Sequence, residues 1–203
     1  MQFDKKHWYD GWFYDKLIAP NQDTMFELIS SLIDNNSSVV DVGCGTGRLD
    51  FQLACKCTSV TGIDLSSKNI KTALNNLNRT HLDNVEFVHG SSEELIKNNR
   101  RFDYAVITYV IHEIPVNERN NFLKTINEIA DKIIIGDYLV PRVKGAWNLL
   151  NEIVEFAAGR DHYKNFKLFV YNGGITSLIK ENNFEILKEI KNHPLTSHIV
   201  LAR

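Results

Sequence analysis

The chain has 203 residues, of which 43% are hydrophobic and 24% are charged, so its composition is globular and excludes a disordered or fibrous protein. Its 23 lysines and arginines against 25 aspartates and glutamates give a net charge of −2. This excludes an overall positive charge that would attract nucleic acid or an anionic membrane. The three cysteines, Cys44, Cys55 and Cys57, lack the spacing of a disulfide framework. Because the first residues form no apolar signal core and no run reaches ~18 apolar residues, we expect a cytoplasmic protein without membrane contact.

Short β-branched runs alternate with helical patterns along most of the chain. An aromatic-rich segment, 1–20, comes first, and a capping box at 24–27 then predicts the start of a helix. Strands are predicted over 38–42, 60–64, 85–89, 104–109 and 132–137, with helical patterns over 47–55, 70–77 and 122–130 between them. This alternation predicts a parallel sheet with helices on both faces.

The C-terminal third departs from this alternation. A segment over 141–172, with a helical stretch at 147–158, follows the fifth strand as an extra piece. After a helix near 174–182, two strand-like runs, 184–190 and 197–202, are joined by a connection too short for a parallel crossover. We expect these two strands to form an antiparallel hairpin at the edge of the sheet.

The most informative segment is 39–49, where a strand runs directly into Gly43, Gly45 and Gly47 and then into a helix. Glycine lets the backbone turn tightly and lets a ligand approach the main chain. Ligands of open parallel sheets bind outside the carboxyl ends of the strands, where the strand order reverses. The dinucleotide fingerprint Gly-x-Gly-x-x-Gly is not matched, because its last position holds Arg48. A nicotinamide enzyme is therefore disfavoured.

Two carboxylates flank the glycines. Asp64 ends the second strand, roughly 20 residues after the glycine loop, where a carboxylate can accept hydrogen bonds from two ribose hydroxyls. Asp41 precedes the glycines and can accept from a ligand ammonium or from loop amides. The alternative for Asp64 is a cap of the helix that begins at Ser66. A cofactor with a ribose and an amino-acid end would use both carboxylates.

The segments 41–47 (Asp-Val-Gly-Cys-Gly-Thr-Gly) and 62–66 (Gly-Ile-Asp-Leu-Ser) resemble the motifs of class I S-adenosylmethionine-dependent methyltransferases. The likeness continues through 84–90 and 101–107. It implies a Rossmann-like α/β fold with a seven-stranded, mostly parallel sheet and an antiparallel C-terminal hairpin. It also implies one methyltransferase domain over 1–203, with S-adenosyl-L-methionine as cofactor and a small molecule as methyl acceptor.

The resemblance carries cofactor-binding roles to single positions. These are Asp41, Gly43, Cys44, Gly45, Asp64, Leu65, Ser91, Ser92, Thr108 and Tyr14. The family often has an aspartate after Gly90, and Ser91 stands there instead, which removes a charge-assisted hydrogen bond to adenine. We expect the segment 1–22 to close over the cofactor as a lid, with Tyr9 or Tyr14 reaching the cofactor's carboxylate, or else to pack on the core.

Candidate catalytic residues end the fourth and fifth predicted strands. His112 and Glu113 follow strand four, and Asp137 and Tyr138 end strand five on the same rim. If the acceptor must lose a proton, His112 is the first candidate base and Asp137 the second. The alternative is a substrate-wall residue without proton chemistry. The positions 108–111 lack the Asn-Pro-Pro-Tyr-like motif of enzymes that methylate bases or glutamine.

We expect no metal, because the late strands lack the paired Asp and Asn of catechol-type enzymes and the cysteines lack zinc-site spacing. The segment 141–172 is expected to shape the acceptor site. Its apolar helical stripe, Trp147, Leu150, Ile153, Val154 and Ala157, is expected to pack in the core or to form a dimer face rather than a substrate pocket. The polar run 160–163 either ends that helix or binds the acceptor.

Two other functional classes stay open. One is an oxidoreductase with a nucleoside cofactor, and the other is a non-catalytic binding or assembly protein with a methyltransferase fold. The absence of a basic groove disfavours nucleic acid as a partner. A homodimer is compatible with the sequence, which does not identify the acceptor.

Overall fold

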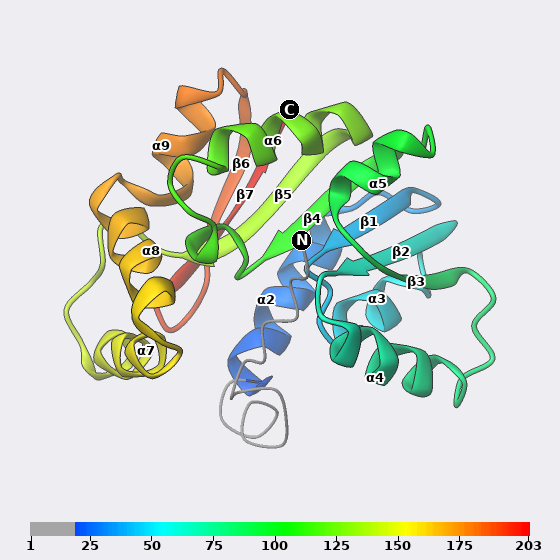
Figure 1. Ribbon diagram of the computed structural model, residues 1–203, viewed down its shortest axis with the longest axis horizontal. Coiled ribbons are helices and arrows are strands. Elements are labelled where there is room, and N and C mark those ends of the chain that lie inside the picture. Colours follow the sequence, from blue (N-terminus) through cyan, green and yellow to red (C-terminus); the bar gives the residue numbers. More distant parts are fainter. Residues whose placement is uncertain (1–18) are drawn as a thin grey trace.

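The computed structural model describes residues 19–203, which contain a seven-stranded sheet in the order β3-β2-β1-β4-β5-β7-β6 (Figure 1). The strands are β1 (Ser38–Val42), β2 (Ser59–Asp64), β3 (Val85–His89), β4 (Phe102–Thr108), β5 (Ala130–Tyr138), β6 (Ile186–Lys191) and β7 (Ser197–Ala202). The described helices are α2 (Ala19–Leu32), α3 (Arg48–Leu53), α4 (Ser67–Leu77), α5 (Ser92–Lys97), α6 (Arg119–Ile129), α7 (Ala146–Ala157), α8 (Arg160–Tyr171) and α9 (Gly174–Glu181), with a 3-10 turn η1 (Ile111–Glu113).

The sheet is parallel from β3 through β5, and its last two strands are antiparallel, as expected for a Rossmann-like methyltransferase fold. The predicted hairpin is confirmed, with β7 lying between β5 and the edge strand β6. Strand order reverses between β1 and β4, which are hydrogen-bonded neighbours although two strands separate them in the chain. The carboxyl ends of these two strands therefore define the crevice in which such sheets bind ligands.

Apolar layers cover both faces of the sheet, and this explains why the strands read as nearly continuous apolar runs. On one face α2 and α3 pack on the sheet through Met25, Ile29, Leu49 and Leu53. On the other face α6, α8 and α9 contribute Leu123, Ile126, Phe166, Phe169 and Ile175. In Figure 1, α8 and α9 lie beside the β6–β7 end of the sheet, and α3 and α4 lie toward β3.

Two helix boundaries differ from the sequence expectation. Helix α2 begins at Ala19, so the capping-box residue Thr24 lies inside the helix. Proline is tolerated in the first turn of a helix, and Pro20 therefore does not delay the start. Gly159 separates α7 from a second helix, α8, which starts at Arg160. The polar run 160–163 is therefore helical.

Helix α7 is turned opposite to the expected packing. Trp147 and Ile153, both from the predicted apolar stripe, are 52% and 56% exposed, and Phe156 is 68% exposed. The side of α7 that faces the protein carries Asn148 and Glu155, which are buried. Packing of the stripe in the core is therefore wrong, and the buried glutamate has polar partners that offset its desolvation. None of the helices in residues 19–203 is both long and apolar enough to cross a bilayer.

Candidate functional site

The loop after β1 has a backbone that requires glycine. Gly43, Gly45 and Gly47 have φ values of 82°, 57° and 84°, in the left-handed region that disfavours other residues. A Cβ at Gly43 would overlap Val110, and a Cβ at Gly47 would overlap Phe87, whereas no atom of residues 19–203 lies within 4 Å of one at Gly45. Gly43 and Gly47 thus allow close internal packing, and Gly45 borders open space.

Asp64 joins this loop to the second strand. Its Oδ2 accepts a hydrogen bond from the Gly45 amide at 2.9 Å, and its Oδ1 accepts from the Ser66 amide at 2.7 Å. Ser66 itself caps α4, because its hydroxyl accepts from the Asn69 amide. The carboxylate therefore lies between the glycine loop and the start of α4, at the carboxyl edge of the sheet, and Leu65 beside it is 57% exposed.

A pair of buried carboxyls lies beneath the loop, one from β1 and one from α3. Within the described residues, Oδ1 of Asp41 and both carboxyl oxygens of Asp50 are buried without a hydrogen-bond partner. Burial raises the pKa of Asp41 to about 7. Burial, followed by the charge of Asp41, raises the pKa of Asp50 well above its usual range. An unpartnered acceptor at this place fits the ammonium of a cofactor with an amino-acid end.

The Asp41 carboxyl should make stability depend on pH. Its folded pKa of about 7 exceeds its ordinary value of 3.8, so its contribution is complete below pH 3.8 and is lost as pH rises through about 7. Between pH 5 and pH 8 the unfolding free energy of the wild-type protein should fall as Asp41 ionises. We expect this fall to be about 2 kcal/mol smaller in Asp41→Asn. Urea unfolding at both pH values, with wild-type protein in parallel, measures the difference. An unchanged pH slope in the variant would contradict the assignment of this proton.

The remaining expected cofactor residues lie around the same edge. Ser91 has extended backbone immediately before α5, Ser92 is buried, and Thr108 is half-buried at the end of β4. Cys44 is buried, and burial raises the pKa of its thiol, so it is not a reactive thiolate. Tyr9, Tyr14 and residues 1–18 of the expected lid over 1–22 lie outside the described residues.

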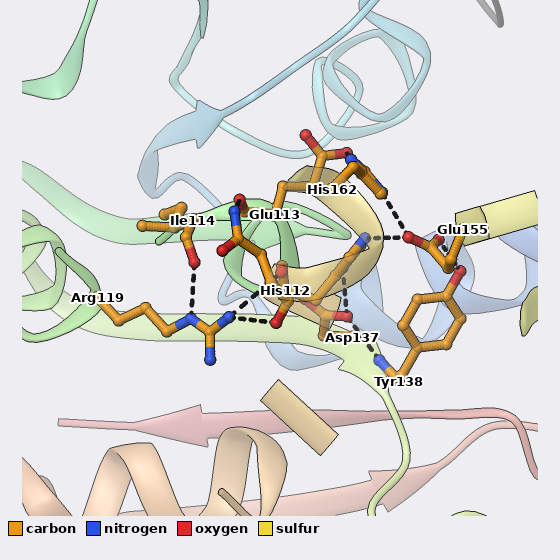
Figure 2. A network of polar contacts seen from close by, with 9 residues as sticks. His112, Glu113, Ile114, Arg119, Asp137, Tyr138, Glu155 and His162 are labelled. Atoms are coloured by element: carbon orange, nitrogen blue, oxygen red, sulfur yellow. Dashed lines mark hydrogen bonds and ion pairs between the residues drawn. The ribbon is translucent and has the colours of Figure 1, made fainter. Parts of the chain in front are cut away.

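His112 and Asp137, the two expected catalytic residues, are in direct contact. His112 lies in η1 immediately after β4, and Asp137 lies in the adjacent strand β5. The His112 Nδ1 and Asp137 Oδ1 atoms are 2.8 Å apart, and the His112 amide donates to Asp137 Oδ2 at 3.2 Å. Their side chains are 3% and 0% exposed, so the sheet holds a buried imidazole–carboxylate pair (Figure 2).

Two residues from the segment 141–172 complete this network. Glu155 of α7 has its Oε2 atom 3.5 Å from His112 Nε2, and the same oxygen contacts His162 Nε2 of α8. Tyr138 donates its hydroxyl to Glu155 Oε1 at 2.6 Å. Figure 2 shows Glu155 pointing between the two imidazoles and the tyrosine. The sequence alone did not single out Glu155, although it is an isolated charge in the apolar run 153–156.

The two carboxylates decide the charge of His112. Burial alone would lower the pKa of His112, but the Asp137 charge and hydrogen bonds to Asp137 and Glu155 raise it well above its usual range. Burial likewise opposes ionisation of Glu155, yet its hydrogen bonds to His112 and His162 lower its pKa. Both carboxylates therefore favour the protonated form of the imidazole.

Arg119 fixes the turn that carries His112. Its guanidinium donates to the backbone carbonyls of Ile114 at 2.9 Å, Asn165 at 2.7 Å and His112 at 3.3 Å. The residue is 2% exposed, and burial lowers its pKa. Arg119 thus ties η1 to α8. Sequence reasoning missed it because its partners are backbone atoms far away in the chain.

The glycine loop, the Asp64 carboxylate and the seven-stranded sheet with its antiparallel end define a class I methyltransferase fold. Residues 39–132 match the family model described as a methyltransferase domain. The match covers just under half of the chain and, with the sheet topology, makes the chain similar to class I S-adenosylmethionine-dependent methyltransferases.

Curated relatives share part of the chain. A probable cobalt-precorrin-6B C(15)-methyltransferase (decarboxylating) of Methanobrevibacter smithii is 38% identical over 81 residues, which are 39% of this chain and 43% of that protein. The release factor glutamine methyltransferase of Fusobacterium nucleatum is 24% identical over 178 residues, 82% of this chain and 47% of that protein. The chain thus spans less than half the length of these relatives.

Solved structures support the fold over nearly the whole chain. Magnesium protoporphyrin IX methyltransferase of Synechocystis, with bound SAH, has a TM-score of 0.71 at 18% identity, and the match covers 95% of this chain and 87% of that one. The PH0226 protein of Pyrococcus horikoshii has a TM-score of 0.74 at 17% identity, covering 98% and 99%. At these identities the likeness establishes the fold.

Proposed function

We propose that this protein transfers a methyl group from S-adenosylmethionine to a small-molecule acceptor by in-line displacement. The observation that carries the proposal is the contact between the Gly45 amide and the Asp64 carboxylate, at the sheet edge where strand order reverses. Beneath it, Asp41 offers a buried oxygen that no described donor satisfies. Together they provide one hydrogen-bond acceptor for a ribose and one for an ammonium, and S-adenosylmethionine carries both of these groups.

The proposed donor site follows from these positions. Asp64 would accept from the ribose hydroxyls, and Asp41 from the ammonium. The loop residues Gly43, Cys44 and Gly45 would line the methionine part of the donor. Leu65, Ser91 and Ser92 would lie toward the adenine, with Thr108 near the sulfonium and Tyr14 as a lid residue. The sulfonium supplies an already activated methyl group, so the protein's main tasks are alignment and exclusion of water.

His112 and Asp137 are the proposed catalytic pair on the acceptor side. Their position after β4 and in β5 is the rim beside the donor loop, because Val110 packs against Gly43. Asp137 would orient the imidazole through Nδ1. A neutral His112 would take a proton from the acceptor, and Asp137 and Glu155 would stabilise the imidazolium that forms.

The acceptor that we propose is a small molecule. It is supported by the name of the Synechocystis neighbour and by the segment 141–172, which sends Glu155 and His162 to the acceptor side.

The proposed domain arrangement, oligomeric state and location rest on other features. We propose a single domain over 1–203, with 1–22 as a lid. The exposed apolar face of α7 supports a homodimer. The free, exposed thiol of Cys55 supports a cytoplasmic location.

Calorimetric titration of the full chain tests the proposed function. We expect S-adenosylmethionine and S-adenosylhomocysteine to bind with a Kd of about 1–10 μM, a binding free energy near −8 kcal/mol. NADH and NADPH, titrated in parallel, should produce no binding heat. Binding of a nicotinamide nucleotide without either adenosyl ligand would replace the proposal with an oxidoreductase. Binding of none of the four would favour a non-catalytic protein.

A further inference from the structure

Three metal-binding side chains meet at the acceptor side of the sheet. His112, Glu113 and His162 each offer a ligand atom, and these atoms all lie within 4.8 Å of one another. They come from η1 and α8, which are separated by nearly fifty positions in the sequence but packed against each other. The two imidazole side chains are 3% and 10% exposed, and the Glu113 side chain is 38% exposed. The two imidazoles of the cluster are therefore buried, and the Glu113 carboxylate is partly exposed to solvent.

The side chains around the cluster orient it. Asp137 accepts from His112 Nδ1 at 2.8 Å, which directs Nε2 toward the cluster (Figure 2). Such a carboxylate on the far nitrogen is the usual support of a metal-binding histidine. Glu155 adds a fourth ligand atom, an oxygen 3.5 Å from His112 Nε2, and Tyr138 donates a hydrogen bond to the other oxygen of that carboxylate.

The backbone beneath the cluster is held by hydrogen bonds as well. Asn165 of α8 donates its amide to the carbonyl of Glu113 at 2.8 Å. Arg119 donates to the carbonyls of His112 and Asn165. These hydrogen bonds join η1 to α8, so the ligands from the two elements keep fixed positions relative to one another. This is the pre-organisation that a metal site requires.

The charges of the cluster favour a cation. Glu113 and Glu155 face the two imidazoles, and Asp137 lies directly behind one of them. The guanidinium of Arg119 donates hydrogen bonds to the backbone carbonyls of Ile114, His112 and Asn165. Asp137 and Glu155 are buried, and a buried carboxylate needs a paired charge or a metal ion; a divalent cation at the cluster would lie beside Glu155 and, through His112, near Asp137.

We propose that His112, Glu113 and His162, together with Glu155, bind one divalent transition-metal cation. Two imidazoles with one or two carboxylates are ligands suited to zinc, iron(II) or manganese rather than to magnesium. This departs from the expectation of no metal, which considered only an Asp–Asn pair and the cysteines. The ligands here come from three separate elements, so no local spacing reveals them.

The location of the cluster gives the cation a function, and this step rests on the proposed methyl transfer. Val110, two residues before His112, packs against Gly43 of the donor loop. An acceptor that coordinates the cation through a hydroxyl oxygen would be placed beside the donor, with the pKa of its hydroxyl lowered. The hydroxyl proton would leave to water, and the oxygen would take the methyl group as S-adenosylhomocysteine is released. The substrate class is then an oxygen acceptor that chelates a metal. With the cation bound, His112 is a ligand, and the role as base proposed above applies to the site without the cation.

Zinc binding to the full chain tests the site. After metals are removed with a chelator, calorimetric titration with zinc chloride should show one equivalent bound at micromolar or tighter Kd. Glu113→Gln changes a partly exposed side chain, so it should fold normally and weaken zinc binding at least about tenfold. His162→Asn should weaken it at least about 100-fold. His81→Asn and Glu128→Gln, both exposed and outside the cluster, are the matched controls and should bind zinc like wild type.

Cobalt(II) absorption separates this site from the free cysteines. Binding by imidazole and carboxylate gives no thiolate-to-metal charge-transfer band, whereas binding at the exposed Cys55 would give one. The proposal is overturned by that band, by equal zinc binding in all variants, or by no binding of zinc, cobalt or manganese to protein that still binds S-adenosylhomocysteine. Zinc binding without any adenosyl ligand would instead leave the metal site standing and remove the proposed methyl transfer.

Discussion

Asp64→Ala is expected to weaken S-adenosylhomocysteine binding by about 2 kcal/mol or more, roughly 30-fold in Kd. The carboxylate stands at the end of β2, where it would accept the two ribose hydroxyls of the ligand. It also accepts from the amides of Gly45 and Ser66, so alanine removes a support of the glycine loop as well. Calorimetry of the variant beside the wild-type protein measures the loss.

Two further variants divide this effect into its parts. Asp64→Asn keeps a carbonyl that can accept from the Gly45 amide but loses the charge toward the ribose, so we expect an intermediate loss. Asp131→Ala removes an exposed carboxylate at the opposite end of the sheet, paired only with Arg101 in the described structure, and should leave binding unchanged. A wild-type Kd for Asp64→Ala would show that the adenosyl ligand binds elsewhere.

Substitution of the loop glycines should separate binding from stability. Gly47→Ala would overlap Phe87 at a φ of 84°, so we expect it to cost at least about 2 kcal/mol of unfolding free energy. Gly45→Ala meets no described residue within 4 Å, so its cost is that of the left-handed backbone, about 1 kcal/mol. Its methyl group, however, enters the open space where the ligand must approach, and binding should fall at least about 30-fold.

Gly47→Ala should therefore cost more stability, and Gly45→Ala more binding. Urea unfolding and calorimetry on the same preparations measure both effects. Gly145→Ala is the control, because Gly145 has an extended φ of 164° and no described residue within 4 Å of its Cβ position before α7. It should change neither stability nor binding. Strong binding by Gly45→Ala would place the ligand away from the loop, and an unchanged stability of Gly47→Ala would mean that Phe87 moves aside without cost.

The fold could be predicted from the sequence because its signals are local. Apolar strands such as 132–137 alternate with helical patterns, and a strand covered on both faces must be apolar throughout. The short connection before Ser197 forced an antiparallel pair. The loop with Gly43 and Gly45 was visible because the required residue type and the required backbone geometry coincide at the same positions.

Part of the candidate site also followed from the sequence. Asp64 was identified because it ends the strand next to the glycine loop, and parallel strands bring their carboxyl ends to one edge. His112 and Asp137 end neighbouring strands, so their common location on the rim could be expected, although not their 2.8 Å contact.

The tertiary structure alone decided the polar network behind that rim. The apolar stripe of α7 predicted burial of Trp147 and Ile153, yet the helix buries Glu155 instead. A glutamate can be buried when imidazole and phenol donors from other elements meet it, and those donors, His162 and Tyr138, lie outside any local pattern. The sequence by itself therefore determined the sheet, the glycine loop and Asp64, whose causes lie in short-range geometry. The orientation of α7 and the His112, Glu113 and His162 cluster depended on contacts between distant segments, which only the folded chain brings together.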